Sequence, residues 1–210
     1  LENQQAQTDK SNNPYIGRAQ TGIKTLNLIL TNMSEATRLE QMLSSTEKID
    51  FDLQQVVKGC ISGYQQIYPA MQFNLNIDVN TLKPSTFLMH GSPEHIVQLL
   101  DKVVSNSVEF SQDNIITIEL KKSSNKHDAE LLISNNGILL PEQLSESLFD
   151  SMVSLRDENQ KTQDKQAVPH LGLGLYISRL ICQFHQGSIS AYNHQNPAGV
   201  TVHISLPTKV

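Results

Sequence analysis

Two glycines stand at the start of an apolar helical pattern near the carboxyl end of the chain. Gly172 and Gly174 flank Leu173, and further apolar residues follow at helical spacing: Ile177, Leu180, Ile181 and Phe184. Glycines at a helix start let the backbone approach a ligand closely, and the free N–H groups there favour an anion. A simple tight turn has the same pattern. The segment by itself is therefore compatible with either a phosphate-binding site or a simple tight turn.

A polar stripe is predicted on a helix over residues 93–110. Its apolar face carries Ile96, Leu99, Leu100 and Val103. Its other face carries Gln98, Lys102, Asn106 and Glu109, at spacings of four, four and three that place them in one row. Spacing alone favours a solvated helix face over a binding site.

Length and composition limit the function classes. A chain of 210 residues suits one domain with an appendage, or two small domains. The net charge is −5 and no block of like charges occurs, so no nucleic-acid partner is expected. No apolar run approaches the roughly 20 residues of a membrane span. Because the chain begins with Leu1, we expect a fragment, with any membrane segment upstream. Cys60 and Cys182 are expected to be reduced core residues.

A long helix is predicted over residues 14–45, with Asn13 as its N-cap and Pro14 at its first position. Apolar residues recur every seven positions, each followed by another three residues later: Ile16, Ile23 and Leu30, then Ala19, Leu26 and Met33. This is a coiled-coil seam, which changes phase at Ala36, Leu39 and Leu43. We expect a homodimer through residues 14–45. The alternative is a long core helix of a monomer.

The rest of the chain alternates between strand and helix patterns. Strands are expected at 49–51, 71–79, 87–89, 114–121, 129–134, 188–193 and 199–206, and helices at 53–64 and 93–110. A last helix is expected to open at the two glycines and to end at Gly187. Residues 135–170 show no clear regular pattern. We therefore expect an α/β (α+β) fold: a two-layer sandwich of a mixed, mostly antiparallel sheet with helices on one face, preceded by a long dimerisation helix.

Four segments in this order resemble the sequence boxes of the sensor histidine kinases. Residues 99–111 read Leu-Leu-Asp-Lys-Val-Val-Ser-Asn-Ser-Val-Glu-Phe-Ser and resemble the asparagine box. Residues 133–141, Ile-Ser-Asn-Asn-Gly-Ile-Leu-Leu-Pro, are similar to the first glycine box. Residues 148–152 resemble the phenylalanine box and residues 170–175 the second glycine box. The resemblance covers about residues 49–207, and residues 14–45 resemble the second helix of the dimerisation hairpin.

The resemblance implies the ATP-binding fold shared with the gyrase, Hsp90 and MutL-type ATPases, with ATP and Mg²⁺ as ligands. Asn106 matches the asparagine that binds the Mg²⁺ bridging the phosphates, since an amide oxygen is a hard ligand. Asn135 matches an aspartate that accepts a hydrogen bond from the adenine amino group, and Gly137 matches the first glycine of its box. Gly172, Leu173 and Gly174 match the segment that lines the phosphates. Residues 153–169 match the mobile lid, whose cations, Arg156, Lys161 and Lys165, either meet the phosphates or are solvated.

Several positions depart from the family pattern. Asn135 offers only a neutral hydrogen bond, worth about 0.5–1.5 kcal/mol against ~1.5–3 for a charged one, so we expect roughly tenfold weaker ATP binding. If its oxygen faces adenine, its NH₂ group must bond to water or a backbone carbonyl, and Ser134 or Asn136 could help to fix that orientation. The alternative is that Asn135 only caps the turn into Gly137. Leu139 stands where a second glycine is typical.

His170 adds a side chain where the second glycine box opens. Lys102 replaces an asparagine, at the position where the hydrolytic relatives have a glutamate that activates water. An ammonium group in its charged form is no general base, so ATP hydrolysis for work is disfavoured.

The resemblance therefore implies the cytoplasmic catalytic portion of a two-component sensor histidine kinase, in a bacterial inner-membrane receptor. Residues 1–46 would be part of the dimerisation hairpin and residues 47–210 the ATP-binding domain. The γ-phosphoryl group would pass to a histidine outside this chain and then to the receiver domain of a response regulator. None of the seven histidines here has phosphoacceptor context, so no catalytic residue is assigned. The alternative is a degenerate domain that binds nucleotide weakly or not at all and acts as a dimeric interaction module.

Overall fold

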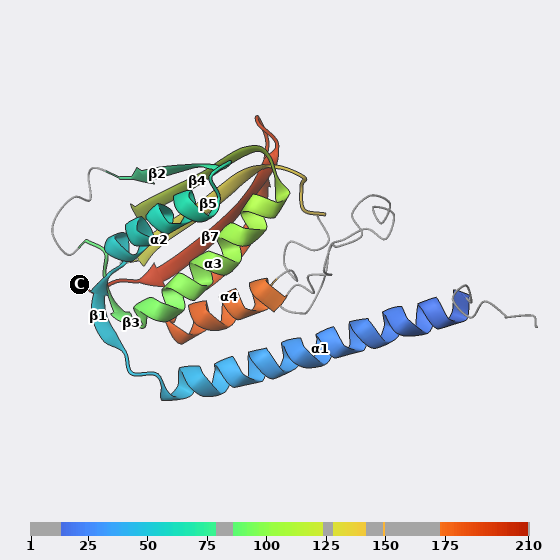
Figure 1. Ribbon diagram of the computed structural model, residues 1–210. Helices are drawn as coiled ribbons and strands as arrows, with labels where there is room; N and C mark the ends of the chain where they lie inside the picture. The colour runs from blue at the N-terminus through green and yellow to red at the C-terminus, as the bar shows by residue number, and fades with distance from the viewer. Residues whose placement is uncertain (1–13, 79–85, 124–127, 142–148, 150–172, 210) are drawn as a thin grey trace, which may run out of the picture.

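The computed structural model describes residues 14–78, 86–123, 128–141, 149 and 173–209. Within these ranges, five strands form one sheet (Figure 1), in the order β2 (Gln72–Ile77), β4 (Ser111–Lys122), β5 (Asp128–Gly137), β7 (Gly199–Pro207) and β6 (Ser188–His194). The β2–β4 pair is parallel and the other three pairs are antiparallel. The sheet is therefore mixed and mostly antiparallel, as predicted.

Three helices cover one face of this sheet: α2 (Leu53–Ile67), α3 (Pro93–Phe110) and α4 (Leu173–Phe184) (Figure 1). The strand residues that face them are buried and apolar; they include Ile116, Ile118, Leu131, Ile133 and Ile204. Residues at alternate positions, such as Glu119, Lys121 and Glu130, are only partly buried. One face of the sheet is covered by helices and the other is solvated, which explains the strict alternation of buried and partly buried residues along β4 and β5. The two-layer expectation is confirmed.

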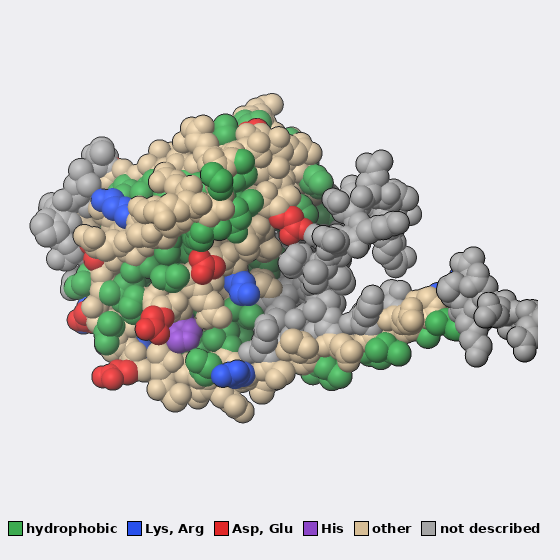
Figure 2. Space-filling model, in the orientation of Figure 1, with side chains coloured by type: hydrophobic (Ala, Val, Ile, Leu, Met, Phe, Trp, Pro, Cys, Tyr) green, Lys and Arg blue, Asp and Glu red, His purple; other side chains and the backbone are tan. Residues whose placement is uncertain are grey.

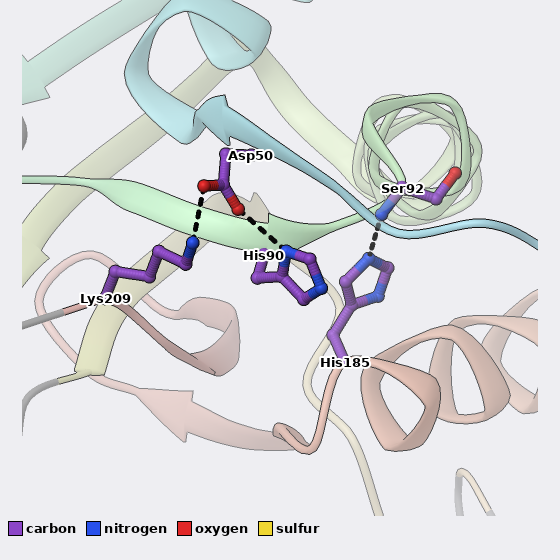
Figure 3. Close-up of polar contacts among 5 residues, drawn as sticks. All are labelled: Asp50, His90, Ser92, His185 and Lys209. Atoms are coloured by element: carbon purple, nitrogen blue, oxygen red, sulfur yellow. Dashed lines mark hydrogen bonds and ion pairs between the residues drawn. The ribbon is translucent and has the colours of Figure 1, made fainter.

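A second, two-stranded sheet lies beside the first. Its strands are β1 (Ile49–Asp52) and β3 (Leu88–Gly91), which pair in antiparallel fashion. The backbone N–H of Lys209 donates to Leu88 O at 2.8 Å, and the Lys209 ammonium pairs with Asp50. Asp50 also meets His90 Nδ1 at 2.7 Å (Figure 3). The connection out of the long helix is thereby tied to the carboxyl end of the chain.

The long helix α1 (Pro14–Ser45) has the predicted bounds and two different environments along its length. Its last third packs on α4 through Ala36, Leu39 and Leu43, each only 6% exposed, and Tyr176 of α4 donates to Glu40 at 3.2 Å. Its outer part leaves the seam residues exposed: Ile16, Ile23, Leu26, Leu30 and Met33. Figure 2 shows hydrophobic side chains spaced along this part. The phase change in the sequence marks where the helix meets the domain. No described helix has the length and apolarity to cross a bilayer.

Several strand ends differ from the sequence expectation: β2 ends at Ile77 rather than 79 and β3 continues to Gly91 rather than 89, and the differences are larger at the start of β4 and the end of β5. Strand β4 begins at Ser111 rather than 114, with an irregular register between Ser111 and Ile116. The Asp113 carboxylate accepts from the Ile115 N–H at 3.0 Å and the Ser111 hydroxyl at 3.2 Å, which stabilises this polar stretch as an irregular edge. Strand β5 continues through Asn135 to Gly137, because Asn135 and Asn136 pair with β7 and Gly137 pairs with Ser111 of β4. From the sequence, the first of these strands was expected to begin only at 114, and no regular pattern was expected at 135–170.

Candidate functional site

Helices α3 and α4 lie side by side and bring the polar stripe against the glycine segment. Gln98, Lys102 and Asn106 are half-buried, whereas Glu109 is exposed. A Cβ placed on Gly174 would lie 3.7 Å from Lys102 Cδ and 3.9 Å from Lys102 Cβ. The first turn of α4 therefore faces the middle of the stripe. This packing disagrees with a fully solvated helix face for Lys102 and Asn106, and it joins two segments far apart in the sequence.

His185, which follows α4, joins the end of α4 to the start of α3. The backbone N–H of Ser92, the N-cap of α3, donates to His185 Nε2 at 3.0 Å (Figure 3). His185 Nδ1 donates to Ile181 O at 2.8 Å, so the ring is neutral with its proton on Nδ1. Lys48 donates to Phe184 O at 2.7 Å and lies 4.3 Å from the centre of that ring. Together these bonds fix the start of α3 to the end of α4 and to the α1–β1 connection.

The neutral imidazole of His185 predicts a loss of stability on acidification. Burial lowers the pKa of His185, and also that of His95, below the ordinary value of 6.5. The unfolded chain therefore binds more protons than the folded chain as the pH falls through 6.5. The free energy of unfolding should fall between about pH 7.5 and 5.5, and level off below the lowered pKa values.

Urea unfolding at both pH values, for the wild type and for His185→Gln, measures this effect. Glutamine does not titrate, so the variant should lose less stability than the wild type over the same interval. An equal pH dependence in both proteins would assign the loss to other groups.

Asn135 lies at the end of the core-facing row of β5. Its side chain is 6% exposed, and among the described residues its amide nitrogen has no hydrogen-bond partner. The hydroxyl groups of Ser134 and Thr201 are 2.8 Å apart, and Asn136 Nδ2 donates to Asp113 Oδ2 at 2.5 Å. Both neighbours therefore use their polar atoms elsewhere, because adjacent strand residues face opposite sides of the sheet. The expectation that they orient the Asn135 amide was wrong.

Gly137 ends β5 against the end of α3. Its φ is +157°, and a Cβ there would lie 2.1 Å from Phe110 O, so only glycine fits. The following residues are fixed by Asn193 of β6: Asn193 Nδ2 donates to Leu140 O, and the Leu140 N–H donates to Asn193 Oδ1, both at 2.8 Å. Nothing in the sequence pattern singled out Asn193. Leu139 is 37% exposed, which shows that its side chain points at least partly into solvent.

Other predicted residues fall in different places. Leu173 begins α4, and Phe149 of the predicted phenylalanine box is buried in the core at 3% exposure. Gly172, Arg156 and the other predicted lid cations, with His170, lie outside the described residues. Lys102 lies beside Gly174 on the helical side, and Asn106 follows one turn later on α3, while Asn135 and Gly137 lie at the end of β5.

Comparison with known proteins adds a family and several relatives. Residues 91–210 match the family described as "Histidine kinase-, DNA gyrase B-, and HSP90-like ATPase". Sensor protein ChvG of Agrobacterium fabrum is 23% identical over 181 residues, which are 85% of this chain and 30% of ChvG. Sensor protein kinase WalK of Staphylococcus aureus is 26% identical over 133 residues, 63% of this chain and 31% of WalK. The chain thus spans less than a third of these relatives.

Solved structures of the histidine kinase ThkA share the fold. Its catalytic domain superposes with a TM-score of 0.58 at 23% identity, covering 78% of this chain and 97% of that one. ThkA in complex with the response regulator protein TrrA gives 0.61 at 18% identity, covering 100% of this chain and 53% of that one. The likeness concerns the fold alone. The names of the relatives confirm the resemblance to sensor histidine kinases that the four boxes indicated.

Proposed function

This chain belongs to the family of histidine kinase-, DNA gyrase B- and HSP90-like ATPases, and on that premise we propose that it is the Mg·ATP-binding catalytic portion of a sensor histidine kinase. The observation that carries the proposal is the packing of Gly174 against Lys102, in the middle of the α3 polar stripe. A helix start beside a cation and an amide suits a phosphate chain with its metal ion. Asn135, which is buried, and Gly137, which is half-buried, lie at the end of β5 and would contact the adenine base.

Each residue has a proposed role. The N–H groups at the start of α4, in the segment Gly172, Leu173 and Gly174, would bind phosphate oxygens. The Lys102 ammonium would neutralise phosphate charge, and Arg156 would do so from the lid. Bound Mg·ATP supplies the phosphoryl group, and catalysis in such sites rests on positioning and charge neutralisation. No carboxylate stands at position 102, so we infer that the site does not activate water for hydrolysis.

Asn106 is the proposed Mg²⁺ ligand. Among the described residues, no cluster of three or more His, Cys, Asp or Glu side chains is arranged to hold a metal ion. A single amide oxygen is nevertheless a suitable contribution, because Mg²⁺ usually keeps several waters and takes its other ligands from phosphates. The half-buried position of Asn106, one turn after Lys102, agrees with this role.

Asn106→Ala should weaken ATP binding in the presence of Mg²⁺, by about tenfold for the loss of one such ligand, and change it little in EDTA. Calorimetric titration under both conditions measures the difference. Ser105→Ala, an exposed neighbour on the same helix, is the control and should bind like the wild type. An equal loss of affinity in EDTA would mean that Asn106 supports only the helix.

The rest of the proposal concerns the whole protein. The γ-phosphoryl group would pass to a histidine outside these residues, and then to the receiver domain of a response regulator. The relatives are called sensor proteins, and ThkA has been solved with a response regulator protein. We further propose that residues 1–46 belong to a dimerisation hairpin and residues 47–210 to the catalytic domain of a bacterial membrane receptor. The exposed seam on α1 supports the homodimer.

A second candidate function is an interaction module that binds nucleotide weakly or not at all. The missing charge at Asn135 and the exposed apolar seam of α1 favour it. A fluorescent ATP analogue, titrated with and without Mg²⁺, separates the two functions. Saturable, Mg²⁺-dependent binding supports the kinase portion, and no binding at millimolar analogue concentrations supports the module.

A further inference from the structure

The buried amide of Asn135 has a donor that the described residues leave unmatched. Its side chain is 6% exposed, and Nδ2 has no hydrogen-bond partner among the described residues. Nearly all buried polar groups in native proteins are paired, so an exception calls for an explanation. One explanation is that Nδ2 donates to an acceptor atom on a bound ligand. This explanation suits the position of Asn135, at the end of the sheet beside Gly137.

The strand pairing of Asn135 limits how far its side chain can move. The backbone of Asn135 is held in the ladder between Ile116 and Val200. Gly199 lies so close that a Cβ there would be 2.2 Å from Asn135 O. The polar atoms of Ser134 and Asn136 bond on the other side of the sheet, to Thr201 and Asp113. The backbone of Asn135 is therefore fixed, and its amide group can change orientation only by rotation of the side chain.

We propose that Asn135 makes the nucleotide site accept 6-oxopurine nucleotides, such as GTP and ITP, in addition to ATP. This inference rests on the proposed nucleotide-binding function. A 6-oxopurine has an acceptor oxygen where adenine has an amino group, and the Asn135 N–H donates to it. With ATP, the amide turns by half a rotation and its oxygen accepts from the adenine amino group. A carboxylate has acceptors only, so it would repel the 6-oxo group.

The test is calorimetric titration of the 210-residue chain with ATP, GTP and ITP at fixed Mg²⁺, with CTP as a pyrimidine control. In the wild type, the affinities for ATP and GTP should agree within about tenfold, because one neutral hydrogen bond replaces another. Asn135→Asp should bind GTP and ITP at least tenfold more weakly while it keeps or gains affinity for ATP. CTP should bind more weakly than the purine nucleotides to the wild type.

The control variant is Asn74→Asp, which makes the same chemical change on the edge strand β2. Asn74 Oδ1 accepts from Gln72 Nε2 at 2.9 Å, an arrangement that an aspartate retains. Its ratio of ATP to GTP affinity should equal that of the wild type. Circular dichroism shows whether Asn135→Asp is folded. If the variant is not folded, the ratio of ATP to GTP affinity in the wild type is the test of the inference.

Two results would overturn the inference in distinguishable ways. A wild-type preference for ATP over GTP of more than about a hundredfold would refute it and leave nucleotide binding, and with it the proposed function, in place. Failure of all the purine nucleotides to bind would refute the proposed function itself, and this inference with it.

Discussion

Gly174→Ala should remove most of the ATP affinity while the fold remains intact. The added methyl group would lie 3.7 Å from Lys102 Cδ, an ordinary van der Waals distance, so the protein has room for it. Alanine is also preferred to glycine within a helix by about 1 kcal/mol, and the melting temperature should stay the same or rise. The same methyl group would keep a phosphate away from the start of α4. A loss of tenfold or more in affinity is expected, corresponding to ~1.4 kcal/mol or more.

Thermal unfolding and nucleotide titration of the same preparation test this result. The matched control is Gly63→Ala in α2, where a Cβ would meet nothing within 4 Å. It should gain similar helix stability and bind ATP like the wild type. If Gly174→Ala binds ATP normally, the phosphates do not approach the start of α4. Gly137→Ala could not separate an effect on binding from an effect on folding, because its Cβ would collide with Phe110 O at 2.1 Å.

Lysine at both Ile23 and Leu30 should convert the proposed dimer into a monomer. These side chains are 59% and 64% exposed on the single chain, and they lie on the seam that a partner helix would cover. Each charge that the interface removes from water costs several kcal/mol. Two such charges per chain, repeated in the partner, are expected to prevent association at micromolar concentration.

Analytical ultracentrifugation of the wild type and the double variant measures the mass. Asn27→Lys with Thr31→Lys is the control, since both are exposed polar residues outside the seam positions. It should keep the wild-type mass. Leu39 and Leu43 are left unchanged because they pack on α4 in the same chain. A double variant with unchanged mass would place the interface elsewhere, or show that the wild type is monomeric.

Elements with local signals could be predicted from the sequence. The start of α3 was readable because Ser92 accepts from the His95 N–H and Pro93 follows it, a cap formed by neighbours in the chain. The span of α1 and the apolar faces of the helices follow from periodicity. The start of β4 at Ser111 and the continuation of β5 through Asn135 were not predicted, because polar residues there are held in strands by distant partners. Strand pairing is non-local, so the polarity of a short segment does not reveal it.

The tertiary structure was needed to show how these elements combine into a site. It placed Gly174 against Lys102, joined Asn193 to the backbone of Leu140, and left the Asn135 donor without a partner among the described residues. It also divided the apolar stripe of α1 between α4 and solvent. Each of these contacts depends on the packing of several helices and strands at once. The pattern within one segment shows which face is apolar or polar, but the neighbour that this face meets is set by the close-packed arrangement of the whole domain.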